Sequence, residues 1–430
     1  MILKNVKRFG LLTQAIFSWF RRPYFSFVQG HVYLLKEELS EIKRYVGKYS
    51  ESTIVEFENR YGYLIGSGQV ISFAAGRMGF FALMRVAEVK SGDEIILQGA
   101  TCSVMANAIL RVGATPIYAD IDPNTFGSCA QAIERVITPK TRMIVAQHSF
   151  GIPCNIKPIV ELAHSKKIFL LEDCALTLGS KVSGKKVGNF GDAALFSTDH
   201  SKPINTLIGG LVYTKNNSLA TLLRKEQKNS KDLPEKKQKQ LWNQFLLERK
   251  FCRPEKYGKM VLKNILTSWF KRNNQPFLSD DFSVEIKTNY PYPARMPSFL
   301  AYLGLKEIQR WPIVQEERKN ILKSYKTRIG SGIQLPKAYY DPLLDIVPLR
   351  LAWSQKEGLK LRRKMSRFID TSWTWFMQPI VPAGDKLANF GYQAGDCPLS
   401  EQIGPNMINL PCNISIPWAK KITEIFQTLN

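Results

Sequence analysis

Residues 168–173 read Ile-Phe-Leu-Leu-Glu-Asp, and residues 193–202 read Ala-Ala-Leu-Phe-Ser-Thr-Asp-His-Ser-Lys. Each stretch begins as a short apolar run, which is typical of a buried β-strand, and each then changes to polar side chains. In an α/β sheet, ligands bind beyond the carboxyl ends of the strands. We therefore expect the carboxylate of Asp173, the hydroxyl of Ser197 and the amine of Lys202 to meet at one edge of a sheet.

Strand-type and helix-type patterns alternate along the chain around these two stretches. Short apolar runs predict strands at 94–97, 115–119, 143–146, 168–171, 193–197 and 211–213. Helical spacing of apolar residues predicts helices at 77–86, 104–112, 130–136 and 159–164. Repeated alternation of this kind favours an α/β fold with a mostly parallel sheet, covered by helices on both faces.

Composition restricts the class of protein. Of the 430 residues, 44% are hydrophobic, which predicts a globular protein and not a disordered one. The sequence has seven Cys but no CxxC pair, which indicates a reducing compartment. The four His are not spaced in the way that the ligands of a metal site are. No apolar run of about 18 residues is present to span a bilayer. We therefore expect a cytoplasmic protein without a metal.

The polar residues beyond the two strands suggest a specific chemistry. A lysine beside a hydroxyl and a carboxylate is the combination that a Schiff-base enzyme needs. The amine attaches the cofactor, the carboxylate keeps a pyridine nitrogen protonated, and the hydroxyl binds a phosphate. An isolated Asp173 would more often be a helix cap or a salt-bridge partner. Here, however, Asp173 is followed in order by Ser197, Lys202 and the pair Gly209-Gly210.

This ordered frame resembles that of the DegT/StrS-type sugar aminotransferases, which belong to the fold type I pyridoxal-phosphate-dependent enzymes. The spacing of 29 residues from Asp173 to Lys202 is similar to the family's own, and the resemblance covers residues 51–215 and 287–430. Further matching segments are Phe73-Ala-Ala-Gly76-Arg77, Asp120-Ile-Asp-Pro123, His148-Ser-Phe-Gly151, Arg295-Met296 and Cys397-Pro-Leu-Ser-Glu401. The resemblance implies a mostly parallel seven-stranded-type sheet with flanking helices, followed by a smaller C-terminal α+β domain.

The resemblance also implies roles for the residues of the frame. Lys202 would bind pyridoxal 5'-phosphate covalently and carry the proton between two carbon atoms during transamination. Asp173 would pair with the pyridinium nitrogen of the cofactor. The family usually has a Gln three residues after this Asp, near the pyridine hydroxyl, but this chain has Leu176. That difference affects the expected identity of the substrate more than the expected identity of the cofactor.

The phosphate of the cofactor would lie between two segments of the chain. The resemblance implies that Ser197 contacts it, together with the backbone amides of Gly76, Arg77 and Met78. These three residues open a predicted helix, and the first amides of a helix attract anions. The alternative is that Gly-Arg-Met-Gly is only a turn between a strand and a helix.

The resemblance implies that three further residues lie near the cofactor or the substrate, and each has an alternative interpretation. Cys102 stands where an aromatic side chain commonly stacks on the cofactor ring, although it could equally be a small core residue. His148 and Arg295 match positions near the cofactor ring or the substrate. His148 could instead be a structural histidine, and Arg295 could form a salt bridge at a helix start. Pro293 replaces an Asn that often precedes this arginine by two residues.

Most of the positive charge belongs to two segments. The net charge is +6 for residues 1–50, with nine Lys or Arg, and +10 for residues 224–272, with fifteen, within a total of +24. We expect a basic helical extension at 1–50, a large cofactor-binding α/β domain at 51–223, a basic helical insertion at 224–286 and a small domain at 287–430.

Each basic segment contains an amphipathic helical pattern, near 9–22 and 256–272, that ends in Ser-Trp-Phe and two cationic residues. This composition is typical of helices at a membrane interface, here the inner face of the membrane. Packing against the body of the protein or against a partner subunit is the alternative. Nucleic-acid binding is not expected, because no recognised module accompanies the charge.

The expected function is transfer of an amino group from an amino acid to an oxo-sugar, which is nucleotide-linked, in polysaccharide or glycoconjugate biosynthesis. The resemblance also implies a homodimer. Two alternatives remain: a pyridoxal-phosphate enzyme of this fold with a different substrate or reaction, and a non-catalytic membrane-associated scaffold or regulator. The lysine retained at 202 argues against the scaffold.

Overall fold

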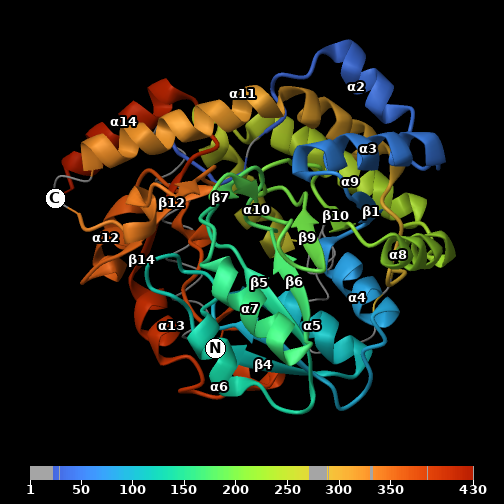
Figure 1. The fold of residues 1–430 in the computed structure, drawn as a ribbon. Helices are drawn as coiled ribbons and strands as arrows, with labels where there is room; N and C mark the ends of the chain where they lie inside the picture. Colours follow the sequence, from blue (N-terminus) through green and yellow to red (C-terminus); the bar gives the residue numbers. More distant parts are fainter. Residues whose placement is uncertain are drawn as a thin grey trace.

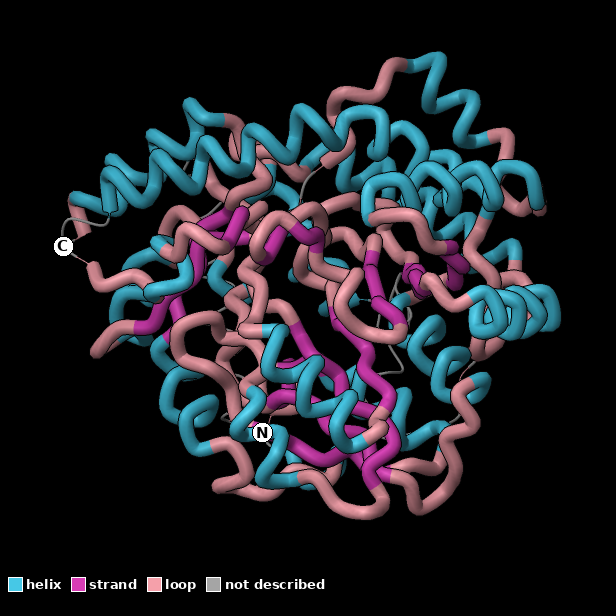
Figure 2. The backbone as a smooth tube through the Cα atoms, in the orientation of Figure 1, coloured by secondary structure: helices cyan, strands magenta, loops and turns pink. Residues whose placement is uncertain are grey.

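The computed structural model describes residues 23–28, 30–270, 288, 290–329, 333–384 and 386–429, apart from the side chains of 264–270. Within this part, the central sheet has seven strands in the order β1-β10-β9-β6-β5-β2-β4 (Figures 1 and 2). The pairings from β9 to β4 are parallel, and those of β10 with β1 and β9 are antiparallel. The strands are β1 (Gln69–Phe73), β2 (Glu94–Gln98), β4 (Thr115–Ala119), β5 (Thr141–Gln147), β6 (Phe169–Asp173), β9 (Ala193–Ser197) and β10 (Gly210–Thr214).

The mostly parallel α/β sheet predicted from the sequence is thus confirmed. One strand, β1, is missing from the prediction, although four of its five residues are buried. A run of only five residues does not distinguish a strand from part of a buried helix by periodicity alone.

Helices flank this sheet. They are α3 (Glu51–Ile65), α4 (Gly76–Val86), α5 (Ser103–Val112), α6 (Ala130–Val136), α7 (Ile156–Lys166) and α8 (Asn217–Asn229). Their ends follow from local sequence. Ser50 caps α3 by accepting the amide hydrogen of Thr53. Gly113 ends α5 with φ +87°, a left-handed conformation that glycine adopts without strain. These helices and the sheet form the main hydrophobic core.

A second core lies under the C-terminal part of the chain. It is built on the antiparallel pair β12 (Arg350–Ser354) and β14 (Met407–Pro411), with α12 (Gly358–Met365) and α14 (Ile416–Gln427). The long helix α11 (Ser298–Ile329) connects the two cores, because Phe299 packs in the main core and Tyr325 in the second (Figure 1). Smaller elements are α2 (Lys36–Lys43), α13 (Pro398–Ile403), β3 (Thr101–Cys102), β7 (Lys181–Val182), β8 (Lys185–Lys186), β11 (Leu344–Asp345) and β13 (Ile380–Val381).

The two basic segments are only partly described. The predicted helix near 9–22 lies outside the described residues. Residues 224–286 include α9 (Glu235–Phe251) and α10 (Tyr257–Phe270), so a helix is confirmed at the second amphipathic pattern. Phe245 of α9 is buried in the main core, and Met260 of α10 packs with Tyr24 in a small separate cluster. None of the helices in the described part combines the length and apolar character needed to cross a bilayer.

Candidate functional site

The carboxylate of Asp173 stands at the carboxyl end of β6. Its Oδ1 accepts the amide hydrogen of Ala175 at 2.9 Å, and only 5% of the residue is exposed. Burial raises the pKa of Asp173, whereas the Ala175 amide and the positive charge of Lys202 lower it in part. Hydrogen bonding to a positively charged partner would therefore favour the ionised form of this buried carboxyl.

Lys202 lies in the loop that follows the neighbouring strand β9. Its charge lowers the pKa of both Asp173 and Cys102, so the three side chains share one site. The net pKa of the Cys102 thiol is nevertheless raised, because burial outweighs the neighbouring charges. Within the described residues, no hydrogen bond or ion pair involves the amine of Lys202. The structure thus places the lysine, the carboxylate and the cysteine near one another, and their roles toward a cofactor stay a prediction.

The start of α4 lies beside Ser197 at the end of β9. A Cβ placed on Gly76 would be 3.8 Å from the Ser197 hydroxyl, and a Cβ on Gly210 would collide with the backbone of Gly76. Gly210 therefore allows β10 to approach the first turn of α4 closely. The amide of Met78 is partly engaged, since it donates to the carbonyl oxygen of Ala75 at 3.0 Å. Contact of residues 76–78 and Ser197 with a phosphate stays a prediction.

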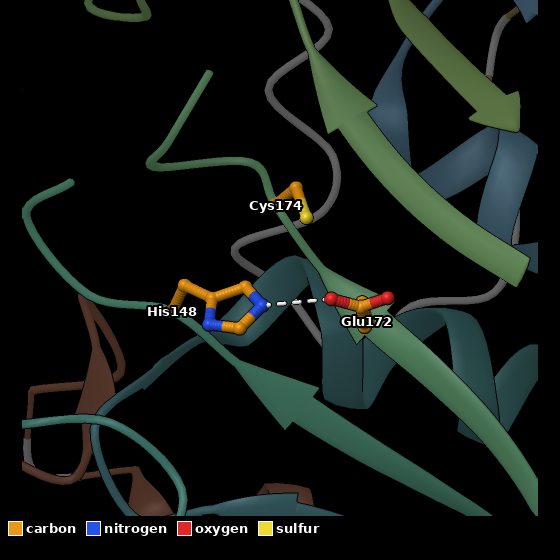
Figure 3. A group of neighbouring side chains, drawn as sticks. All are labelled: His148, Glu172 and Cys174. Atoms are coloured by element: carbon orange, nitrogen blue, oxygen red, sulfur yellow. Dashed lines mark hydrogen bonds and ion pairs between the residues drawn. The ribbon is translucent and has the colours of Figure 1, made fainter. Parts of the chain in front are cut away.

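A second buried carboxylate, Glu172, anchors the same strand end (Figure 3). Its oxygens accept hydrogen bonds from the amides of Gly188, Phe190 and Gly191, and its Oε2 lies 3.2 Å from Nε2 of His148. Burial alone raises the pKa of Glu172, but these hydrogen bonds outweigh burial and hold the pKa below its usual value.

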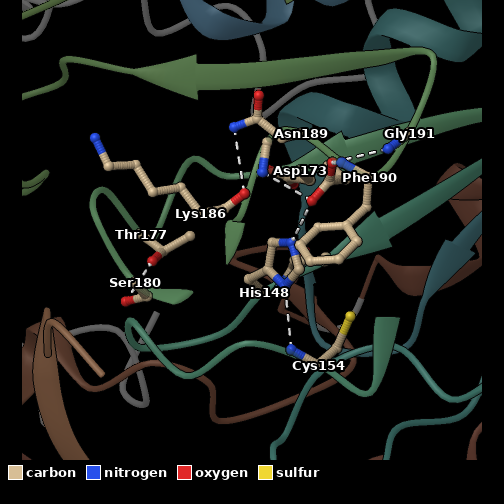
Figure 4. A network of polar contacts seen from close by, with 12 residues as sticks. His148, Cys154, Asp173, Thr177, Ser180, Lys186, Asn189, Phe190 and Gly191 are labelled. Carbon is tan, nitrogen blue, oxygen red and sulfur yellow. Dashed lines mark hydrogen bonds and ion pairs between the residues drawn. The ribbon is translucent and has the colours of Figure 1, made fainter. Parts of the chain in front are cut away.

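Both ring nitrogens of His148 are occupied. Nδ1 accepts the amide hydrogen of Cys154 at 3.1 Å, so the proton lies on Nε2, which donates to Glu172 (Figure 4). This geometry is that of a structural histidine, which the sequence left open as the alternative for His148. His148, Glu172 and Cys174 also lie close enough to hold a metal ion. The hydrogen bonds above already use the lone pairs of the histidine and the carboxylate, so this group does not fit a metal.

Sequence reasoning considered Asp173 and overlooked Glu172. Adjacent residues of a strand point to opposite faces, so the two carboxylates serve different surroundings. The glycine-rich segment Gly188–Asp192, which supplies three amides to Glu172, was the available signal for a buried acceptor.

Arg295 forms a bidentate ion pair with Asp232, with both N–O distances at 2.9 Å, and its guanidinium lies over the ring of Tyr49. This geometry is that of the salt-bridge alternative. A contact between Arg295 and a substrate stays a prediction.

His200 lies two residues before Lys202, and the sequence suggested only that it could be a polar group of the pocket, without a definite role. Its Nδ1 lies 3.1 Å from Oε1 of Glu248 in α9, and its Nε2 lies 3.6 Å from Asp199. Burial lowers the pKa of His200, but Asp199 and Glu248 more than compensate and raise it to about 9. A helix of the basic insertion therefore supports the lysine loop directly.

These features define an α/β enzyme fold with a lysine–carboxylate site at the carboxyl edge of a mostly parallel sheet. The chain belongs to the DegT/DnrJ/EryC1/StrS aminotransferase family, whose model matches residues 36–429. The match begins within the predicted N-terminal extension and includes the basic insertion.

Two relatives illustrate the similarity in sequence. GDP-perosamine synthase of Escherichia coli O157:H7 is 37% identical over 185 residues, which are 41% of this chain and 51% of that protein. The matched region thus spans about half the length of this relative. The spore coat polysaccharide biosynthesis protein SpsC of Bacillus subtilis (strain 168) is 26% identical over 394 residues, covering 87% of this chain and 89% of that protein.

The fold is also similar to solved structures. The PMP form of Spr1654 from Streptococcus pneumoniae superposes with a TM-score of 0.70 at 19% identity, covering 95% of this chain and 99% of that chain. At this identity the similarity concerns the fold alone.

Proposed function

We propose that the protein is a pyridoxal 5'-phosphate-dependent aminotransferase that transfers an amino group from an amino acid to a nucleotide-linked oxo-sugar. One observation supports the proposal: the amine of Lys202, which has no hydrogen bond or ion pair within the described residues, lies close enough to the buried carboxylate of Asp173 to lower its pKa. Membership of the family supports the reaction class.

The residues fit the cofactor. Asp173 uses one oxygen for the Ala175 amide, and a protonated pyridine nitrogen would complete its hydrogen bonding. Ser197 and the helix start at Gly76 would hold the phosphate. Cys102 would lie beside the ring, where its small side chain leaves room that an aromatic residue would fill. When bound, the cofactor supplies an electron sink for the carbon that loses its proton.

The chain's own residues then have separate tasks. Lys202 would hold the cofactor, and its amine, once released, would carry the proton during amino-group transfer. Asp173 would keep the ring nitrogen protonated. Glu172 touches neither reacting atom, but it fixes the end of β6 and so the position of Asp173. His148 orients Glu172, and we assign neither residue a direct contact with the substrate.

The substrate class rests on the relatives. GDP-perosamine synthase and a spore coat polysaccharide biosynthesis protein support a nucleotide-linked sugar and a role in polysaccharide biosynthesis. The test is to incubate the purified protein with pyridoxal phosphate, glutamate and a panel of nucleotide-linked oxo-sugars. Mass spectrometry should detect an aminated sugar nucleotide with the wild type and none with Lys202→Ala. If no oxo-sugar is aminated although glutamate is deaminated, the alternative of another substrate holds.

We further propose that the protein is a homodimer in the cytoplasm with peripheral contact to the membrane. The seven cysteines, all within the described residues, are free thiols, which supports a reducing compartment. The family resemblance supports the dimer, so light scattering should give the mass of two chains, whereas an active monomer would contradict it. Met260 of α10 is buried in a cluster with Tyr24, so this side chain takes no part in a membrane contact.

A further inference from the structure

A cavity of about 630 Å³ lies between the N-terminal segment, the start of α10, the middle of α11 and the start of α14. Its volume is within the range of small-molecule sites. Neither Lys202 nor Asp173 lines it. The residues that line it come from the N-terminal extension, the basic insertion and the C-terminal part of the chain.

The lining is rich in cations. It includes Arg253, Lys256, Arg310 and Arg318, and the only acidic residues in it are Glu255 and Glu317, which are exposed. Within the described residues, Arg253, Lys256 and Arg318 form no ion pair, and Arg310 has only Glu307 at 3.8 Å. The protein thus leaves most of this positive charge without a carboxylate partner.

Arg318 is the most deeply buried of these four cationic side chains. It is 2% exposed, and its Nη1 donates to the carbonyl oxygen of Pro348 at 3.1 Å. Its Nε and the Nε of Arg253 are shielded from solvent and meet no acceptor in the described part of the chain. Burial lowers the pKa of Arg318 to about 10. The nearby charge of Glu307 raises the pKa of Arg318 in part, but the two side chains form no ion pair. A buried guanidinium without a direct anionic partner is costly, and a charge-assisted hydrogen bond would offset that cost.

Two helices add to the positive potential. The segment 253–256 leads into α10, and Asn413–Ser415 lead into α14, so both helices begin at the cavity. The side chain of Ser415, at the N-cap position, makes no capping hydrogen bond. The first turn of a helix carries partial positive charge. The amides of Lys256 and Tyr257 already donate to the carbonyl oxygen of Arg253. Pro417 in the first turn of α14 has no amide hydrogen, so the two helix starts contribute through this charge.

The N-terminal segment separates this cavity from the lysine loop. Ser26, Val28 and Gly30 line the cavity. Phe27, in the same segment, lies under the guanidinium of Arg350. Further along, Nε2 of His31 lies 2.9 Å from the carbonyl oxygen of Asn205, which is three residues after Lys202. The same stretch of chain therefore lines the cavity and contacts the loop that carries Lys202.

We propose that this cavity binds a small anion that carries a phosphate or diphosphate group, at a site distinct from the one around Lys202. Four cationic side chains and two helix starts favour a multivalent anion over a carboxylate. The volume exceeds that of inorganic phosphate alone, so a phosphorylated organic molecule is the expected occupant.

The test uses the full chain loaded with pyridoxal phosphate, so that the phosphate site at Ser197 is filled. Inorganic diphosphate is titrated in a calorimeter, with wild type, Arg253→Gln/Lys256→Gln and Lys420→Gln. Lys420 is exposed on α14, outside the cavity, and controls for loss of positive charge. Circular dichroism establishes that each variant is folded. We expect saturable binding that the double variant weakens at least about tenfold and Lys420→Gln leaves unchanged.

Two further measurements identify the kind of molecule that carries the phosphate group. UDP or GDP that binds more tightly than diphosphate, with the same dependence on Arg253 and Lys256, indicates a nucleotide. Vesicles with anionic phospholipid that compete with diphosphate indicate a lipid headgroup. Absence of saturable binding at millimolar diphosphate overturns the proposal, as does equal weakening by Lys420→Gln. Binding that is insensitive to Arg253→Gln/Lys256→Gln overturns it too, because the anion then binds elsewhere. No readout depends on catalysis, so the result is independent of the proposed function.

Discussion

Nε2 of His148 lies 3.2 Å from Oε2 of Glu172, and neither side chain is exposed to solvent. The contact joins the loop after β5 to the end of strand β6, directly beside Asp173, the carboxylate proposed to bind the cofactor nitrogen. Three backbone amides complete the surroundings of Glu172. A fully satisfied polar network of this kind is rigid, but it is expensive to break.

We therefore expect Glu172→Gln to destabilise the protein by about 3–5 kcal/mol, because the amide nitrogen would face hydrogen-bond donors in a buried site. Urea unfolding followed by circular dichroism measures the change. Glu161→Gln, on an exposed position of α7, is the matched control and should change stability by less than about 0.5 kcal/mol. Equal stability of the two variants would mean that the Glu172 network does not hold the strand end.

Asp173→Asn should separate cofactor binding from catalysis. The amide cannot keep the ring nitrogen protonated, so the interaction lost is one that matters mainly in the transition state. We expect near-normal cofactor content and a rate of amino-group transfer at least about a hundredfold lower. Absorbance titration gives the content and single-turnover kinetics give the rate. A variant that keeps its rate would remove Asp173 from the site.

The pH dependence of stability should report on His200. Its pKa is about 9 in the folded protein against 6.5 for the free side chain. A raised pKa stabilises the fold fully below pH 6.5, and this contribution is lost as the pH rises through 9. Over this window, urea unfolding should show that the wild type loses up to about 3 kcal/mol more than His200→Gln. Parallel stability curves for the two proteins would show that His200 is not charged in the fold.

Membrane contact predicts that the protein co-sediments with vesicles containing anionic lipid and detaches as salt increases. Trp19→Ala/Trp269→Ala should remain folded and lose this binding, because the two tryptophans would enter the interface. Both side chains lie outside the described part of the chain. Pelleting that does not depend on lipid, or a double variant that unfolds, would favour packing of these residues against the protein.

Local sequence patterns were sufficient for much of the fold. The strand at 115–119 and the helix at 130–136 have the predicted bounds, since each is a short regular run with clear turns around it. The second core could not be predicted from local sequence. Its strands β12 and β14 pair across more than fifty residues, and only the tertiary fold brings them together.

The same distinction holds for the site. Asp173 and Ser197 end the neighbouring strands β6 and β9, and Lys202 lies in the loop after β9, so the topology of the sheet places all three at one edge. The pairing of Arg295 with Asp232 spans 63 residues and leaves no signal in local sequence. The contact of His200 with Glu248 depends on how the basic insertion folds back.

The attachment of the cofactor to Lys202 tests the central claim most directly. The purified protein is incubated with pyridoxal phosphate, reduced with borohydride, digested, and its peptides are analysed by mass spectrometry. We predict one modified peptide, which carries the reduced cofactor on Lys202, and no adduct in Lys202→Ala. An adduct on a different lysine, or a protein that stays colourless and unmodified, would contradict the account.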